Sequence, residues 1–310
     1  MEKQQMMRRA TGMLSVLALW SGLAVAQSTP LALPREDASS IRYYLDAVVP
    51  GQASPTLLVI LQGSDCNSVR HIRLVRDPMR QVLPAADLLT VEKYGIDDTL
   101  PYSEDAQRQD CPEAFVQHDT PQQRVSDVTR VLQTVIKRNG YQKVVVLGGS
   151  EGAVIANLVT ASSGLVDATL AFSGGGRWFI DDVRHSVAGA PKEEAAGLNA
   201  FLQQVQTAPP FTLNASDHGY AWWHGMLNID QLAILRSIKT PVLIVQGGKD
   251  RAVSPAAVGQ MIAELRAAGK TNITYVNYAE LDHVMRRENG ASEMTRVVAD
   301  MRDWLEKTLR

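Results

Sequence analysis

The chain has 310 residues, with 31 lysines and arginines against 33 aspartates and glutamates, and 45% of it is hydrophobic. The formal net charge of −2 and the lack of a basic block argue against nucleic acid as the main partner. The length suits one large domain with an insertion, and after the first 26 residues no segment is apolar enough to span a bilayer.

The first 26 residues have the layout of a secretory signal peptide. Lys3, Arg8 and Arg9 are followed by an apolar run from Met13, which ends at the small-x-small site 24–26. We therefore expect residues 1–26 to be removed, leaving a periplasmic or secreted protein without a stable membrane anchor. An uncleaved N-terminal anchor is the alternative.

Short apolar runs closed by small or polar residues recur along the chain. Such runs are typical of strands buried on both faces. We predict six of them, at residues 56–61, 86–91, 143–147, 168–172, 241–245 and 273–278. The stretch 41–48 is β-prone and predicts an earlier strand, and residues 27–40 are interpreted as a leader to the fold.

Helical patterns separate these strands. They cover residues 69–82, 121–139, 153–161, 255–268 and 292–309. The alternation predicts an α/β fold in which residues 27–310 build a mostly parallel central sheet with helices on both faces. Residues 177–238 contain helix-like stretches, 192–205 and 227–238, but no strong strand, which predicts an inserted cap.

Cys66 and Cys111 are the two cysteines of the chain. Export would favour a disulfide bond between them, because oxidising compartments allow such bonds to persist. Two separate thiols are the alternative.

The sequence Gly148-Gly149-Ser150-Glu151-Gly152 follows a predicted strand directly and precedes a helical pattern. A Gly-x-Ser-x-Gly pattern between strand and helix is typical of a serine nucleophile held on a tight turn. A glycine-rich turn without chemistry is the alternative. A phosphate-binding turn is disfavoured because no matching glycine signature is present here.

The chain order serine, acid, histidine selects the other two catalytic candidates. Asp250 ends the strand that follows the cap, and His283 is the one histidine beyond it. His283 is predicted to be the general base and Asp250 to orient it. Asp282 and Asp230 are weaker candidates for the acid. His218 and His224 lack a third ligand at zinc-like spacing, so no metal site is expected.

Acyl transfer also needs two N–H donors for the oxyanion. Glu151 follows the nucleophile, and Ser64 lies in the loop after strand 56–61, with Gly63 as its alternative. Four aromatic residues are candidates for a substrate pocket, with packing inside the cap as the other possibility: Trp178, Tyr220, Trp222 and Trp223.

These blocks together resemble the α/β-hydrolase superfamily over residues 40–310. Residues 148–152, 246–250 and 281–283 are similar to its three catalytic blocks. Residues 92–99 resemble a turn found in exported members related to dienelactone hydrolases and prolyl-oligopeptidase-type enzymes. One departure is Gln62-Gly63, where His-Gly is common. The resemblance implies hydrolysis through an acyl-enzyme, with no metal or cofactor.

Three functions are compatible with these observations. The favoured one is a serine hydrolase that cleaves a small-molecule ester, thioester or lactone. A serine peptidase of prolyl-oligopeptidase type is the second. It is disfavoured because such enzymes usually carry a large extra N-terminal domain, and only about 15 residues lie between the predicted cleavage site and the first strand. The third is a non-catalytic binding protein on a hydrolase scaffold, which the joint presence of Ser150, Asp250 and His283 disfavours.

Overall fold

A computed structural model describes residues 29–52, 54–105 and 108–310. The predicted signal peptide lies outside these described residues. Within them, no helix combines the length and the apolar character that a bilayer crossing requires.

Eight strands form one sheet in the order β1-β2-β4-β3-β5-β6-β7-β8. The strands are β1 (Leu31–Pro34), β2 (Ser40–Asp46), β3 (Thr56–Leu61), β4 (Asp87–Val91), β5 (Lys143–Gly149), β6 (Ala168–Phe172), β7 (Val242–Gly247) and β8 (Ile273–Tyr278). β2 runs antiparallel to both its neighbours. All the other neighbouring strands, β3 to β8, pair in parallel. The predicted α/β class and mostly parallel sheet are confirmed.

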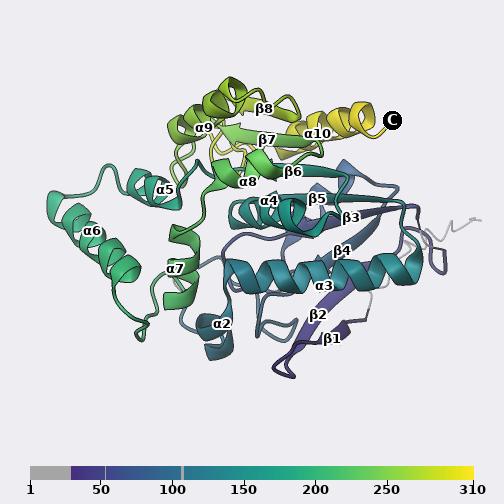
Figure 1. Ribbon diagram of the computed structural model, residues 1–310, viewed down its shortest axis with the longest axis horizontal. Coiled ribbons are helices and arrows are strands. Elements are labelled where there is room, and N and C mark those ends of the chain that lie inside the picture. The colour runs from purple at the N-terminus through teal and green to yellow at the C-terminus, as the bar shows by residue number, and fades with distance from the viewer. Residues whose placement is uncertain (1–28, 53, 106–107) are drawn as a thin grey trace, which may run out of the picture.

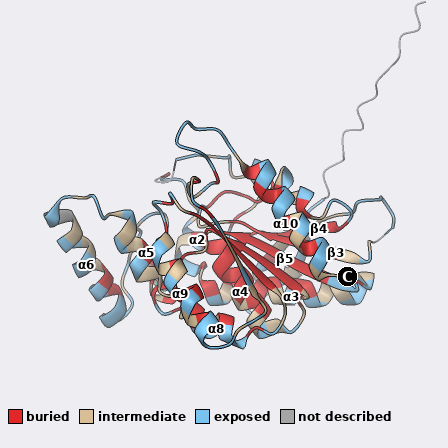
Figure 2. Cartoon of the chain, turned by 90° about the horizontal axis from the view of Figure 1, so that it is seen from above, coloured by how far each residue is buried: buried red, intermediate tan, exposed pale blue. Residues whose placement is uncertain are grey.

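Helices cover both faces of the sheet, and the central strands between them, β3 to β7, are almost wholly buried (Figures 1 and 2). One face packs against α10 (Met294–Thr308), the short α1 (Arg73–Arg76) and the 3-10 helix η1 (Met79–Val82). The other face packs against a layer of four helices: α3 (Pro121–Asn139), α4 (Glu151–Ser163), α8 (Gln231–Ser237) and α9 (Pro255–Ala267). Alternate residues of β5 point to opposite faces, which is why Val144, Val145, Val146 and Leu147 are all apolar.

Helices α5 (Phe179–Ser186), α6 (Lys192–Thr207) and α7 (Tyr220–Leu227) follow β6 and project to one side of the sheet (Figure 1). They share their own apolar cluster, which includes Trp222, Trp223 and Leu202. α8, which ends the interval 177–238, instead packs on α4 and α9. We call α5–α7 the helical insertion.

Several predicted elements differ from the structure. The single helix expected over residues 69–82 is two short pieces, because Pro78 lacks the N–H that a continuous helix needs. The leader 27–40 contains the edge strand β1. β8 is only partly buried, since it ends the sheet and has one strand neighbour. Helices α2 (Glu113–His118), α5 and α7 were not predicted.

Candidate active site

Ser150 stands on the turn between β5 and α4. Its backbone has φ 55° and ψ −127°, a strained conformation for a residue with a side chain. The Ser150 N–H donates to Phe172 O on β6 at 3.0 Å, which fixes the turn. The predicted nucleophile therefore has the sharp strand-to-helix turn that presents a hydroxyl above the sheet.

The glycines on both sides of Ser150 make this turn possible. A Cβ on Gly148 would lie 2.0 Å from Gly152 O, and one on Gly149 would lie 2.3 Å from the Phe172 ring. A Cβ on Gly152 would lie 2.2 Å from Leu61 O. The turn thus packs against β3, β6 and α4 at distances that no larger residue allows.

His283 and Asp250 meet across two loops at the carboxyl ends of β7 and β8. His283 Nδ1 lies 2.8 Å from Asp250 Oδ2. Asp250 Oδ1 accepts the N–H groups of Ala252 and Val253, and Oδ2 also accepts from the Gln246 side chain. Burial raises the pKa of the Asp250 carboxyl, but the His283 hydrogen bond and charge outweigh it and lower the pKa.

The two weaker acid candidates are engaged elsewhere. Asp282 Oδ1 accepts the backbone N–H groups of Val284 and Arg286. Asp230 caps α8 and pairs with Arg177. Among the described residues, Asp250 is the carboxylate that contacts His283.

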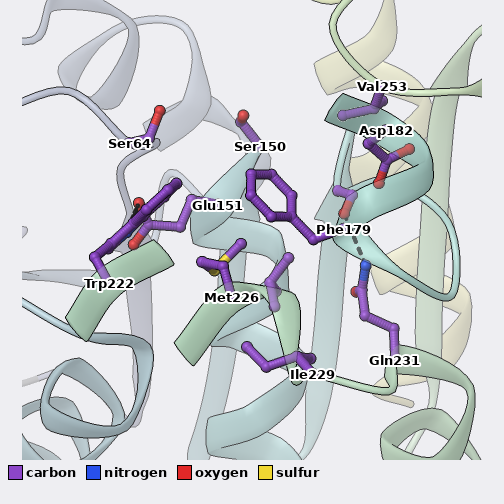
Figure 3. Close-up of a pocket in the computed structure, with 12 residues that line it drawn as sticks. Ser64, Ser150, Glu151, Phe179, Asp182, Trp222, Met226, Ile229, Gln231 and Val253 are labelled. Atoms are coloured by element: carbon purple, nitrogen blue, oxygen red, sulfur yellow. Dashed lines mark hydrogen bonds between the residues drawn. The ribbon is translucent and has the colours of Figure 1, made fainter. Parts of the chain in front are cut away.

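Ser150 lies between two cavities. The first, of about 90 Å³, lies under the helical insertion, and Figure 3 shows Ser64 and Ser150 at one end of it with Met226 and Ile229 beyond. The second, of about 190 Å³, is lined by Ser150, His283 and apolar residues that include Met79. No hydrogen bond in the described chain joins Ser150 Oγ to His283, although both groups line this second cavity. Such contacts are often long before substrate binds.

The candidate oxyanion donors lie beside Ser150. A Cβ on Gly63 would lie 3.5 Å from the Ser150 Cβ, so the loop after β3 touches the nucleophile. Ser64 lines the first cavity. Glu151 is the first residue of α4, so its N–H has no partner within the helix. The geometry leaves Ser64 and Gly63 both possible as the second donor.

The Glu151 carboxylate is more than a charge in a first helical turn. It is buried and lies 2.7 Å from Arg124 Nη1 and 3.6 Å from Lys93 Nζ. Burial raises the pKa of Glu151, but the positive charges of Lys93 and Arg124 outweigh it and lower the pKa to about 2.

The structure separates the four predicted pocket aromatics. Trp222 lines the first cavity, where it lies beside Glu151 (Figure 3). Trp223 packs edge-on against Phe201 inside the helical insertion. The Tyr220 hydroxyl donates to Ala208 O, and Trp178 packs beside the Arg177 guanidinium. These last three lie outside the cavity wall because they pack within the insertion or at its ends.

Sequence reasoning missed Arg124, and it gave Lys93 and His218 no role at this position. All three are buried next to Glu151. Arg124 lies four residues before Val128 on the buried stripe of α3. A charged residue on a buried helix face is rare unless it is paired, so the sequence pattern could have marked Arg124 as a candidate. Lys93 follows a buried strand, where charge is equally rare. His218 stacks on Trp222 with ring centroids 3.7 Å apart.

A disulfide bond joins Cys66 to Cys111 and leaves no free cysteine in the described chain. It ties the segment just after the Gln62–Asp65 loop to the segment before α2. In the described residues no group of three His, Cys, Asp or Glu side chains is arranged to hold a metal ion.

Comparisons with known proteins bear on the fold. A family model described as the prolyl oligopeptidase family matches residues 198–310. No curated protein sequence matches at a significant level.

Solved structures share the fold at low identity. Est1E from Butyrivibrio proteoclasticus with bound ferulic acid matches at a TM-score of 0.63 and 16% identity, over 90% of this chain and 99% of that one. The Pyrococcus furiosus esterase Pf2001 matches at 0.62 and 13%, over 98% and 97%. The acylaminoacyl peptidase of Pyrococcus horikoshii matches at 0.60 and 10%, over 91% of this chain and 42% of that one.

The fold is therefore that of the α/β-hydrolase superfamily, which confirms the resemblance seen in the sequence.

Proposed function

We propose that this protein is a serine carboxylic ester hydrolase that works through an acyl-enzyme on Ser150. The observation that carries the proposal is the position of Ser150: on a strained turn, between two cavities, one of which it shares with the Asp250-bound His283. Each part has a defined role in acyl transfer.

In the proposed reaction, Ser150 Oγ attacks the ester carbonyl carbon and its proton passes to His283 Nε2. The N–H groups of Glu151 and of Ser64 or Gly63 bind the oxyanion. As the tetrahedral intermediate collapses, the bond to the alkoxy group breaks and His283 protonates the departing alcohol. Water, deprotonated by His283, then attacks the acyl-enzyme and releases the acid and free Ser150. Asp250 stabilises the imidazolium throughout.

The two cavities suggest which half of the ester lies where. The general acid must reach the leaving oxygen, so the alcohol half belongs on the His283 side, in the cavity of about 190 Å³. The acyl half then enters the cavity of about 90 Å³ beside Trp222. A cavity of about 150 Å³ holds benzene, so the smaller space favours an acyl chain of a few carbons over an aromatic acyl group.

A fluorophosphonate probe tests the proposal directly. We expect it to label the wild-type protein and not Ser150→Ala, with both proteins folded by circular dichroism. Rates on nitrophenyl acetate, butyrate and octanoate, beside methyl ferulate, then test the acyl size. Labelling of Ser150→Ala would overturn the proposal by showing that another residue is the nucleophile. No labelling of the folded wild type would also overturn it and would favour a non-catalytic binding protein.

A serine peptidase is the second candidate, and the match of residues 198–310 to the prolyl oligopeptidase family supports it. The same nucleophile would then cleave an amide. Faster turnover of an acyl-peptide or prolyl nitroanilide than of any nitrophenyl ester would favour this candidate.

We also propose that the protein is exported and acts in the periplasm or outside the cell. The signal-peptide pattern of residues 1–26 and the Cys66–Cys111 disulfide support this location. N-terminal sequencing of the mature protein, expected to begin at Gln27, and fractionation of the producing cells would test it.

A further inference from the structure

We infer that Arg124 and Lys93 are positioning residues that fix the two halves of the oxyanion hole relative to each other. This inference rests on the proposed function. The two halves come from distant parts of the chain, the Gln62–Asp65 loop after β3 and the start of α4. A shift of either half would misalign the N–H donors, and such alignment accounts for much of the rate in acyl transfer.

Arg124 binds both halves at once. Its Nη1 donates to Glu151 Oε1 at 2.7 Å, and its Nη2 donates to the backbone oxygen of Gln62 at 2.8 Å. The Arg124 side chain is 4% exposed. A guanidinium is planar and rigid, so its two bonds set a fixed spacing between the loop and α4.

Lys93 makes a second, parallel bridge. Its Nζ donates to Asp65 O at 2.9 Å and lies 3.6 Å from Glu151 Oε2. The Lys93 side chain is fully buried. The loop is thus held by carbonyl groups at both its ends, Gln62 and Asp65, and within the described residues no hydrogen bond engages the N–H groups of Gly63 and Ser64. Because peptide units are planar and trans, the held carbonyl of Gln62 also fixes the direction of the Gly63 N–H, whereas the held carbonyl of Asp65 anchors the far end of the loop.

The helical insertion closes the same cluster. Trp222 Nε1 lies 3.3 Å from Glu151 Oε2, and His218 stacks on Trp222 with ring centroids 3.7 Å apart. Burial and the charge of Lys93 lower the pKa of His218 to about 3, so its ring stays neutral. The carbonyl groups of Gln62 and Asp65 are therefore held by two residues, Arg124 and Lys93, that also contact the Glu151 carboxylate.

A cluster of this kind could serve stability alone, so the test needs a matched control. Arg35 is a partly buried arginine that pairs with Asp127 of α3 at 2.7 Å, and no hydrogen bond or ion pair in the described part of the chain joins it to the loop. Arg35→Lys makes the same chemical change as Arg124→Lys. Lys93→Met provides an independent variant if Arg124→Lys does not fold.

We expect Arg124→Lys and Lys93→Met to lower kcat on nitrophenyl butyrate by about 10²-fold, the usual effect of losing one oxyanion donor, with KM changed less than about threefold. The rate of fluorophosphonate labelling and the affinity for an alkyl boronic acid should fall by a similar factor. Arg35→Lys should lower the urea midpoint without changing kcat.

The inference would be overturned if wild type, Arg124→Lys and Lys93→Met had equal kcat and equal boronate affinity, whatever their stability. The proposed function would still stand. A fall in kcat for Arg35→Lys as large as that for Arg124→Lys would also overturn it, because the effect would then follow stability. Failure of the wild type itself to react with the fluorophosphonate would remove the proposed function, and this inference with it.

Discussion

Asp250 Oδ2 lies 2.8 Å from His283 Nδ1, and the other oxygen of the same carboxylate is held by two backbone N–H groups. The Asp250 side chain is fully buried, whereas that of His283 is 25% exposed. The carboxylate is thus fixed by its own loop, and the imidazole is the partner that is free to meet solvent and substrate. This asymmetry fits an acid that orients and a base that reacts.

The first prediction concerns the charge of Asp250. Asp250→Asn keeps the shape but permits the wrong imidazole tautomer, so we expect kcat to fall by about 10³–10⁴-fold with the fold retained. Ester hydrolysis and circular dichroism would measure both effects. Asp282→Asn is the matched control, and its activity should stay within about twofold of wild type. A larger loss in Asp282→Asn than in Asp250→Asn would reverse the assignment of the acid.

The second prediction concerns the close approach of α4 to β3. A Cβ on Gly152 would lie 2.2 Å from Leu61 O, so Gly152→Ala should cost roughly 2 kcal/mol or more of unfolding free energy. The same change at Gly197, which lies on the exposed side of α6 with open space around it, should stabilise by roughly 0.5–1 kcal/mol. Urea unfolding of the two variants checks the contrast, and similar midpoints would contradict it.

The third prediction tests which cavity holds which half of the ester. Met226 lines the cavity under the insertion, and Met79 lines the cavity shared with His283. Met226→Ala should shift the preferred acyl chain to longer nitrophenyl esters. Met79→Ala should leave acyl preference unchanged and instead improve esters of bulkier alcohols. The opposite pattern would show that the two halves bind the other way round. Each truncation should also cost about 2–5 kcal/mol of stability.

Much of this architecture could be predicted from the sequence. The helix at 121–139 was predicted with its observed bounds, because Thr120 and Pro121 start it and Gly140, with φ 72°, ends it. The buried strands β3 and β6 were also predicted with their observed bounds. These elements are governed by local chemistry and by apolar runs, which the sequence displays directly.

What could not be predicted depends on contacts between distant segments. α7 carries aromatic residues on several sides, so no single apolar stripe marked it as a helix. Nothing local distinguishes Trp222, which lines the cavity, from Trp223, which packs against Phe201. The cluster around Glu151 joins residues as far apart in the chain as Lys93 and Trp222, and its charges are stable only because they are brought together.

The fourth prediction concerns the Cys66–Cys111 disulfide, which closes a loop of 45 residues. The chain-entropy model gives such a bond about 4 kcal/mol of stabilisation, so the double variant Cys66→Ala with Cys111→Ala should lose about that much in urea unfolding. Dithiothreitol should lower the midpoint of the wild type and leave that of the double variant unchanged. An equal response of both proteins would contradict the prediction.

The fifth prediction concerns Asp182, a buried residue of α5 that lines the cavity beside Trp222. Burial raises the pKa of its carboxyl from 3.8 to about 7, although N–H groups of Ser254 and Gly176 oppose the shift. The folded state therefore binds the proton more tightly than the unfolded state. The stabilisation that the Asp182 proton gives the folded state is fully present below pH 3.8 and is lost as the pH rises toward 7.

Between pH 5 and pH 8 this group alone should cost the wild type about 2–3 kcal/mol of unfolding free energy. Asp182→Asn keeps an acceptor oxygen for the Ser254 N–H but does not titrate. Its unfolding free energy should therefore fall by about 2–3 kcal/mol less than that of the wild type over the same pH range. Asp119, whose pKa burial also raises to about 7, remains in both proteins, so their difference isolates Asp182. Urea unfolding at the two pH values measures this difference. Parallel pH profiles for wild type and Asp182→Asn would show that the Asp182 carboxyl stays ionised in the folded protein, because only a protonated group makes the two profiles diverge.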